Sequence, residues 1–321
     1  MIKYDKFDQR IIDELLNNSR IPLTKLSRKL HKNRENVLYR FNRLVRLGII
    51  QSMNATINTK YFGYTQYALF LQLKQVDETI ERKLISFLQE STINSWIGVV
   101  VGKWSLVADV YACSHKKLNS QIGLIMHTYK RFIQECTVMK LKEKVYTFAA
   151  DRVSNHDATL QLDTLDYSLL HELNKDARIS YASLSSKFRR TANTLKRRIK
   201  LLEKHNIIKG YSAVIDHQAI GLEVYGLQLK ILSDVKRNVR KINECLLRYG
   251  NVVFVYEYTH GPWNLEIGIA TRTPSEMRLF IRQLKHDLPN DVIISSYYQL
   301  LETMSSGKLP KKILGGEGNN K

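Results

Sequence analysis

Two stretches of the chain are crowded with side chains that can bind nucleic acid. Residues 25–46 hold eight Lys and Arg against one acid, and residues 187–204 also hold eight against one. Arg and Lys can hydrogen-bond guanine, Asn can hydrogen-bond adenine, and an excess of positive charge attracts phosphates. A single arginine is often only a solvated charge, but two dense clusters favour a nucleic-acid ligand. The predicted DNA-binding residues are Lys32, Asn33, Arg34, Asn36, Tyr39, Arg40, Arg43, Arg190, Thr191, Asn193, Thr194, Arg197, Arg198 and Lys200.

Other reactive side chains show no such grouping. The nine histidines do not cluster in the sequence, and no nucleophile pattern, metal-ligand spacing or cofactor fingerprint is visible. Cys113, Cys136 and Cys245 are far apart, so we interpret them as reduced thiols and not as a disulfide or a zinc site. Residues 315–318 read GGEG, but without a following helix they resemble a phosphate-binding loop only superficially. We therefore predict no enzyme activity, no catalytic residue, no cofactor and no metal.

The whole chain is basic, with 50 Lys and Arg against 30 Asp and Glu and a net charge of +20. This balance favours a polyanionic partner such as nucleic acid, an acidic membrane surface or a multiply anionic ligand. A generally basic cytosolic protein is the plainer alternative. Charged residues interrupt the first ten positions, and no apolar stretch approaches the roughly 18 residues that span a bilayer. We expect a cytoplasmic protein with no signal peptide and no membrane contact.

The elements that carry the basic stretches occur twice. Residues 5–73 align with residues 163–231 without a gap, and one inserted residue later Gly102, Trp104 and Leu106 align with Gly261, Trp263 and Leu265. A repeat of this length is a duplicated pair of domains, because solenoid units are only about 20–50 residues long. A duplicated unit can act as a covalently joined pseudo-dimer that binds its ligand in two related but unequal places.

The first part of each repeat is predicted to be helical. Apolar residues recur at helical spacing over residues 7–16, 23–30 and 37–44, with Asn33 as the predicted N-cap of the third helix. The second copy repeats the pattern, with Ser180 and Thr191 as predicted caps. A strand over residues 49–57 follows the third helix. Three helices with a short turn before the third, followed by a β wing, indicate a winged helix-turn-helix.

The second part of each repeat changes period. Residues 67–73 alternate as a strand, followed by a helix near 80–88, strands at 96–101 and 104–111, a helix at 115–132 and a strand at 137–148. The second copy follows the same order over residues 225–300. The order βαββαβ is the ferredoxin-like split arrangement.

The predicted fold class is therefore α+β, with two repeats that each combine a winged helix-turn-helix head and a ferredoxin-like βαββαβ body. We expect the sheets of the two bodies to pack on each other, within one chain or between chains. The predicted domains are head 1 at 1–62, body 1 at 63–148, a linker at 149–161, head 2 at 162–220, body 2 at 221–304 and a flexible tail at 305–321.

The heads resemble a known family. The segments LDTLDYSLLHELNKDARISYASLSSKF (162–188) and RIKLLEKHNIIKGYSAVIDHQAIGL (198–222) resemble the N-terminal half of Lrp/AsnC-type transcriptional regulators. YDKFDQRIIDELLNNSRIPLTKLSRKL and RFNRLVRLGIIQSMNATINTKYFGY match the same pattern. The resemblance covers nearly the whole chain twice and is closest to tandem two-copy, archaeal-type members.

This resemblance implies double-stranded DNA as partner, bound with the third helix in the major groove. It also implies homo-oligomers and an amino-acid-like effector bound by the bodies. The family often has an Asp shortly after the glycine of the body, in a G-x-x-D pattern. Ser105 and Asn264 stand at those places here, which puts effector binding in doubt.

Two other functions compete with a regulator. Siroheme decarboxylases are similar to this family in architecture and would rely on basic and His side chains around an anionic tetrapyrrole. The residues that could lie near such a site are Tyr258, His260, Trp263 and Asn264. The first copy has no histidine around Gly102, and this function leaves the basic helices unexplained. A basic architectural or RNA-binding protein would show weak sequence preference and strong salt dependence.

The outward residues of the third helix differ between the copies, which predicts two unlike DNA half-sites. Glu35, Asn36 and Tyr39 align with Asn193, Thr194 and Arg197. Leu201 replaces Arg43 in the second copy, where the neighbouring Lys200 partly substitutes for it. We expect Arg40 and Arg198 to contact bases, each contributing about 1–3 kcal/mol to binding.

Overall fold

The computed structural model describes residues 4–146, 160–232, 235–246, 249–259, 261–287, 292–304 and 308–314. The chain divides into two compact units. The head unit combines Met1–Gly63, Phe148–Ile220 and Ser306–Lys321, and the body unit combines Tyr64–Thr147 and Gly221–Ser305. Each unit therefore contains one part of each repeat. Most of the predicted linker, residues 149–159, lies outside the described residues.

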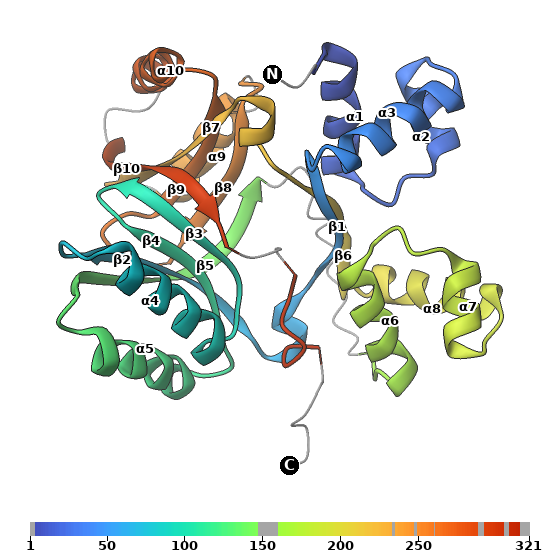
Figure 1. The fold of residues 1–321 in the computed structure, drawn as a ribbon, viewed down its shortest axis with the longest axis horizontal. Helices are drawn as coiled ribbons and strands as arrows, with labels where there is room; N and C mark the ends of the chain where they lie inside the picture. The colour runs from blue at the N-terminus through green and yellow to red at the C-terminus, as the bar shows by residue number, and fades with distance from the viewer. Residues whose placement is uncertain are drawn as a thin grey trace. The chain divides into compact units, whose positions relative to one another are not determined.

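Each head has the predicted order of three helices and one strand (Figure 1). Head 1 consists of α1 (Lys6–Asn17), α2 (Leu23–Leu30), α3 (Arg34–Arg46) and β1 (Ile50–Ile57). Head 2 consists of α6 (Thr164–Lys175), α7 (Tyr181–Phe188), α8 (Ala192–Lys204) and β6 (Ile208–Ile215). Short 3-10 helices, η1 (Thr59–Phe62) and η2 (Gln218–Ile220), follow the strands.

The predicted helix caps are confirmed. The side chain of Asn33 accepts the N–H of Asn36 at 2.8 Å, and Thr191 accepts the N–H of Thr194 at 3.2 Å. Ser180 caps α7 in the same way, because its hydroxyl oxygen accepts the N–H of Ser183 at 3.0 Å. These contacts satisfy amide groups that the first turn of a helix leaves without partners.

The two heads share a sheet that the sequence did not predict. Strand β1 pairs antiparallel with β6, and Asn54 lies opposite Ser212 near the middle of the ladder. Helix α1 packs against β6 and α6 packs against β1, so each helix covers the strand of the other repeat. Ala55 and Ile57 of β1 accordingly belong to the core of head 2. Pairing covers one edge of each wing strand.

Two equivalent arginines connect the same heads. Arg178 donates to the carbonyl oxygens of Ser19 at 2.7 Å and Ile21 at 3.0 Å. Arg20 donates to the carbonyl oxygens of Ala177 and Ile179, which are the equivalent positions in head 2. The loop between the first two helices of each head is thus hydrogen-bonded by the other head.

The body unit contains two copies of βαββαβ, as predicted. Body 1 consists of β2 (Thr65–Leu73), α4 (Glu78–Ser91), β3 (Asn94–Gly102), β4 (Leu106–Ala112), α5 (His115–Tyr129) and β5 (Ile133–Tyr146). Body 2 consists of β7 (Glu223–Ile231), α9 (Val235–Leu246), β8 (Val252–Tyr258), β9 (Leu265–Thr271), α10 (Pro274–Asp287) and β10 (Val292–Thr303).

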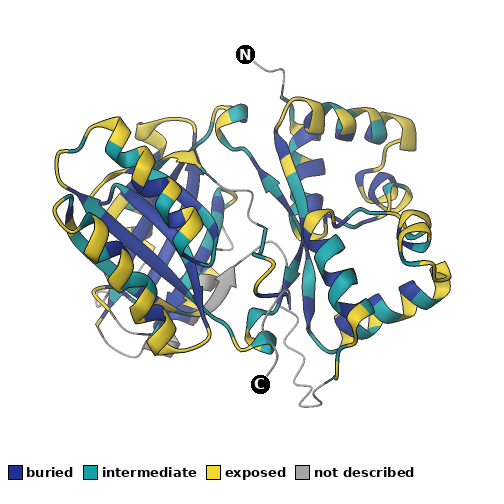
Figure 2. Cartoon of the chain, turned by 60° about the horizontal axis from the view of Figure 1, so that its bottom comes forward, coloured by how far each residue is buried: buried dark blue, intermediate teal, exposed yellow. Residues whose placement is uncertain are grey.

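The strands of both bodies form one closed barrel in the order β10-β3-β4-β2-β5-β8-β9-β7. The two sheets share a core, and they also pair along both edges, through β5 with β8 and β10 with β3. The shared core inside the barrel includes Phe70, Trp104, Trp263 and Tyr298. Helices cover the outside over two further apolar clusters, so the strands are buried and the outer helix faces exposed (Figure 2). Barrel closure removes the sheet edges.

Part of the predicted flexible tail is packed. Leu309 exchanges two hydrogen bonds with the side-chain amide of Asn174, at 2.9 and 3.1 Å. Ile313 and Leu314 are buried, and Leu314 joins the core of head 2. The tail prediction is therefore wrong for residues 308–314, because Leu314 packs in the core of head 2 and Leu309 is hydrogen-bonded to Asn174 of α6. The remainder, from residue 315, lies outside the described residues.

Candidate nucleic-acid interface

The third helix of each head buries one face and exposes the opposite one. In α3 the buried residues are Val37, Phe41 and Leu44, and in α8 they are Leu195, Ile199 and Leu202. Exposed residues at spacings of four, three and four lie on the opposite side. We call these residues the outer rows. They are Glu35, Tyr39, Asn42 and Arg46 in α3, and Asn193, Arg197, Lys200 and Lys204 in α8.

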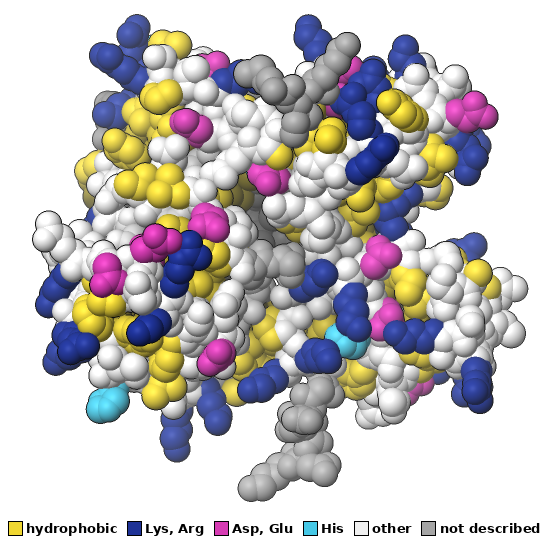
Figure 3. Space-filling model, viewed as in Figure 1, with side chains coloured by type: hydrophobic (Ala, Val, Ile, Leu, Met, Phe, Trp, Pro, Cys, Tyr) yellow, Lys and Arg dark blue, Asp and Glu magenta, His cyan; other side chains and the backbone are white. Residues whose placement is uncertain are grey.

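Most of the predicted DNA-binding residues are exposed at the start of these helices or in these rows. The exposed ones are Lys32, Asn33, Arg34, Asn36, Tyr39, Arg190, Thr191, Asn193, Arg197 and Lys200. Thr194 is half-buried, and its hydroxyl lies 2.9 Å from that of Thr191. In the view of Figure 3, Lys and Arg side chains are spread over the helices of both heads.

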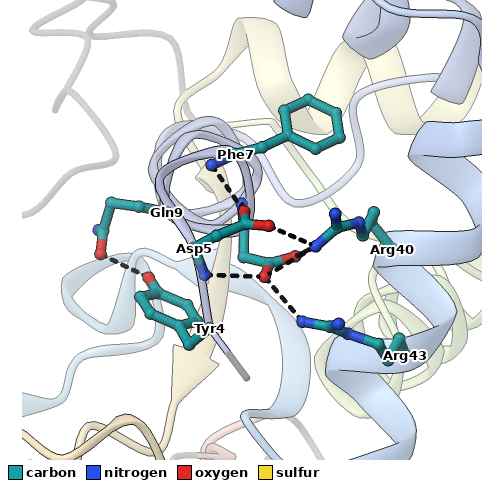
Figure 4. A network of polar contacts seen from close by, with 7 residues as sticks. Tyr4, Asp5, Phe7, Gln9, Arg40 and Arg43 are labelled. Carbon is teal, nitrogen blue, oxygen red and sulfur yellow. Dashed lines mark hydrogen bonds and ion pairs between the residues drawn. The ribbon is translucent and has the colours of Figure 1, made fainter. Parts of the chain in front are cut away.

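Arg40 and Arg43 are placed differently from the prediction. A guanidinium nitrogen of Arg40 lies 2.7 Å from a carboxylate oxygen of Asp5 and 3.2 Å from one of Asp8. Arg43 lies 2.7 Å from Asp8, whose side chain is fully buried. Figure 4 shows both arginines reaching from α3 to the N-terminus of α1. We call this network the clamp of head 1.

The clamp forms because α1 begins with a capping box. Asp5 accepts the N–H groups of Phe7 and Asp8, and Asp8 accepts the N–H of Asp5. The hydrogen bond from the Asp8 N–H, with help from Arg40, holds the pKa of Asp5 below its ordinary value. Asp5 at this helix end is therefore an anionic partner for an arginine that passes beside it.

Head 2 has a smaller clamp. Arg198 lies 2.7 Å from Asp163 and 3.0 Å from Asp166, the two residues of the capping box of α6. Leu201 replaces the second arginine, and burial raises the pKa of Asp166. Arg40, Arg43 and Arg198 thus form ion pairs with carboxylates of their own heads. Sequence spacing alone could not reveal partners about thirty residues away.

Positive charge is distributed differently in the two heads. The outer row of α8 contains three basic residues and no acid, whereas the row of α3 contains one of each. The second helices differ in the opposite direction, with more positive charge in head 1 than in head 2. Lys25 and Arg28 of α2 align with Ser183 and Ser186 of α7. Asn42, Arg46 and Lys204 are row residues that the sequence analysis did not select. A helical wheel centred on the buried residues would have found them.

Body 2 contains a row of polar residues across its sheet, of which Gln228 and Glu266 are buried. Ser296, Gln228, Glu266 and Tyr256 are paired in turn across β10, β7, β9 and β8. Gln228 accepts a hydrogen bond of 3.0 Å from Trp104 of the other body. Glu266 accepts the hydroxyl groups of Tyr258 and Tyr298, and burial raises its pKa to about 7. Phe70 and Val107 stand in place of Gln228 and Glu266 in body 1.

Most of the residues considered for binding an effector or a tetrapyrrole are buried or hydrogen-bonded to the backbone of the chain itself. Ser105 accepts the N–H of Leu73, and Asn264 accepts the N–H of Ile231 at the equivalent place. Tyr258 and Trp263 are buried inside the barrel. His260 lies outside the described residues. Within the described ranges, no three His, Cys, Asp or Glu side chains are grouped to hold a metal ion. No helix of these ranges is both long and apolar enough to cross a membrane.

Comparison with known proteins identifies the heads. Residues 4–51 match the family model for a winged helix-turn-helix DNA-binding domain, and residues 162–203 match that for an AsnC-type helix-turn-helix domain. A helix-turn-helix transcriptional regulator of Pyrococcus furiosus is 31% identical over 127 residues, which cover 39% of this chain and 81% of the relative. The chain belongs to the Lrp/AsnC family. The AsnC regulatory protein of Haemophilus influenzae is 30% identical over 119 residues, covering 36% of this chain and 76% of that protein.

These Lrp/AsnC relatives match little more than a third of the chain, whereas the solved structures of NirDL are similar over nearly all of it. The siroheme decarboxylase NirDL superimposes with a TM-score of 0.62 and covers 96% of both chains. The sequence identity is only 11%, so this likeness concerns the fold alone.

Proposed function

We propose that this Lrp/AsnC-family chain is a cytoplasmic, sequence-specific regulator that binds double-stranded DNA as a covalent pseudo-dimer. The observation that carries the proposal is the pair of exposed outer rows on α3 and α8, which belong to one head unit. Exposed cations on such helices neutralise phosphates, and the helices fit the major groove.

The contacts between the heads support the pseudo-dimer. A dimeric regulator needs two recognition helices held at a spacing that suits two half-sites. Here the β1–β6 ladder and the reciprocal contacts of Arg20 and Arg178 join the heads without a second chain. One chain therefore contains the pair of heads that simpler family members obtain from two chains.

Within each head, the clamp arginines position the recognition helix and the exposed residues contact DNA. Arg40, Arg43 and Arg198 fix the third helix to the start of the first. The DNA contacts are then left to the exposed residues of the predicted set, which differ between α3 and α8. Two unlike half-sites follow, so the preferred operator is asymmetric.

The proposal is tested by binding the full chain to a pool of genomic fragments at two salt concentrations and sequencing the recovered DNA. A shared, asymmetric motif that survives the higher salt supports a specific regulator. Binding without a motif that is lost steeply with salt would indicate an architectural protein instead. An Arg34→Glu, Arg190→Glu double variant reverses one exposed charge in each head and is expected to lose binding while remaining folded.

Effector binding and self-association are further parts of the proposal. The family suggests an amino-acid-like effector and a homo-oligomer. Ser105 and Asn264, the residues in place of the family's Asp, hydrogen-bond the ends of β2 and β7. A thermal-shift screen with the amino acids tests the effector, and light scattering of the purified chain tests the oligomer. No shift with any amino acid would remove the effector from the proposal.

A siroheme-decarboxylase-like activity is the second candidate. It is favoured by the likeness to NirDL over 96% of both chains. This activity would not explain the exposed outer rows of α3 and α8 or the difference between them. The test is to add siroheme to the purified chain and record porphyrin absorbance and released carbon dioxide. A bound spectrum with turnover would establish the enzyme, and no spectral change would eliminate it.

A further inference from the structure

The outer rows of α3 and α8 differ most in chemistry at their second position. Tyr39 and Arg197 are equivalent in the two repeats, and both are exposed, with Tyr39 61% accessible. Within the part of the chain that the structure describes, neither side chain has a hydrogen bond or an ion pair. Neither residue is therefore needed to hold its own helix in place.

The arginines that follow them are identical in the two repeats and are already engaged. Arg40 and Arg198 bind the carboxylates of their capping boxes. Because both heads use this position for the clamp, it cannot distinguish one half-site from the other. The difference between the half-sites must then come from neighbouring exposed positions, and Tyr39 and Arg197 lie next to the clamp on the outer side.

The two side chains have different chemistry toward a base pair. A guanidinium can donate two hydrogen bonds to O6 and N7 of guanine in the major groove. An aromatic ring has no such pair of donors, and its apolar face suits the methyl group of thymine. The neighbouring residues are consistent with this division, because the row of Arg197 also contains Lys200 and Lys204, whereas the row of Tyr39 contains the acid Glu35 and a single base, Arg46.

We propose that Arg197 and Tyr39 are the specificity-determining pair of this protein. Arg197 reads a guanine in the half-site under head 2, and Tyr39 reads a thymine at the symmetry-related place under head 1. This inference rests on the proposed function, because it names the bases that the same recognition helices select. The positive charge of α2, including Lys25 and Arg28, then anchors head 1 to phosphates, while the outer row of α3, with one acid and one base, has no net charge.

The test is selection from a randomised duplex pool with the full chain and three variants, Arg197→Tyr, Tyr39→Arg and Arg197→Lys. In the unaltered protein we expect one half of the motif to prefer guanine over the other bases by about 5- to 150-fold, which corresponds to one bidentate contact. Arg197→Tyr is expected to abolish that preference in one half only, which identifies the half read by head 2. Tyr39→Arg is expected to introduce a guanine preference in the other half.

Arg197→Lys separates charge from geometry. Lysine keeps the positive charge but cannot form the planar pair of hydrogen bonds, so we expect a weaker guanine preference with a nearly unchanged dependence of binding on salt. Lys196→Ala is the matched control, because Lys196 is an exposed cation of α8 outside the outer row. It is expected to weaken binding to all sequences alike and to leave the motif unchanged.

The outcomes distinguish this inference from the function on which it rests. A motif that none of the substitutions at 39 and 197 alters would overturn the base assignment and leave the regulator intact. An unaltered protein that selects no motif at all would overturn the sequence-specific function itself. Because both side chains are exposed, the variants are expected to unfold at the same denaturant concentration as the parent.

Discussion

Arg20 and Arg178 occupy equivalent positions in the two repeats, and each donates hydrogen bonds to two carbonyl oxygens in the other head. The relationship is reciprocal, as at the interface of a symmetric dimer, although both arginines belong to one chain. Arg178 also lies 5.0 Å from the centre of the Phe41 ring, and Arg20 lies 5.1 Å from that of Tyr181. Each arginine therefore connects a loop of one head with a ring and a backbone of the other.

Removal of either arginine is expected to destabilise the head unit. Arg178→Ala leaves the carbonyl oxygens of Ser19 and Ile21 without their donor, so we expect a loss of about 1–3 kcal/mol in the free energy of unfolding. Urea unfolding of the full chain measures this loss. Arg46→Ala, at an exposed position, is the control and is expected to change stability by less than about 0.5 kcal/mol. Equal effects of the two substitutions would contradict the role of Arg178.

The clamps predict different consequences for the two heads. Arg198→Ala removes the arginine that pairs with Asp163 and Asp166, whereas Arg40→Ala leaves Arg43 beside the buried Asp8. We therefore expect Arg198→Ala to cost more stability, about 2–3 kcal/mol, than Arg40→Ala at about 1–2 kcal/mol. Denaturant unfolding of both variants tests the order.

The same two variants separate positioning from contact with DNA. If the clamp arginines only position the third helix, their loss reduces stability and leaves the salt dependence of DNA binding nearly unchanged. Arg34→Ala, the exposed comparison, is expected to reduce the salt slope by about one unit with little effect on unfolding. A reduced salt slope for Arg198→Ala without loss of stability would show that it contacts DNA directly.

Glu266 predicts a pH dependence of stability. Burial raises its pKa from 4.5 to about 7, so the folded chain holds the proton more tightly than the unfolded chain. The stability that the protonated Glu266 side chain adds to the folded chain is fully present below about pH 4.5. It is lost as the pH rises to about 7 and does not change further above that pH. The decline is on the order of 3 kcal/mol. Urea unfolding at pH 4 and pH 8 spans the whole decline, and Glu266→Gln is expected to remove most of the difference. A pH dependence that persists unchanged in that variant would assign it to other groups.

The packed tail predicts that a short truncation matters. A chain that ends before residue 308 lacks Leu314, which packs in the core of head 2, and the buried Ile313. Burial of such a side chain contributes about 1.5–3 kcal/mol, so we expect a lower thermal unfolding temperature for head 2. A chain that ends after Leu314 is the matched control and is expected to match the full chain. Asn174→Ala, which removes two hydrogen bonds to Leu309, should have a smaller effect in the same direction.

The duplication and the type of each element could be read from the sequence because they depend on local patterns. Apolar spacing and the capping residues Asn33, Ser180 and Thr191 predicted the helices, and they are confirmed. The cationic surface was also predictable, since exposed charge follows from the same helical period. The protein partners of individual charges were not predictable, because the ion pairs of Arg40 with Asp5 and of Arg198 with Asp163 join residues far apart in the sequence.

Only the tertiary structure decided how the repeats combine. The sequence pattern of a strand indicates that β1 and β6 each need a partner strand, but it does not indicate that they pair with each other. Closure of eight strands into one barrel likewise requires that edge strands from different repeats pair with each other. Leu309, Ile313 and Leu314 have no regular spacing, so their burial could not be read from the tail. In each case the stabilising contact joins segments far apart in the chain, and its free energy depends on a partner that local sequence does not identify.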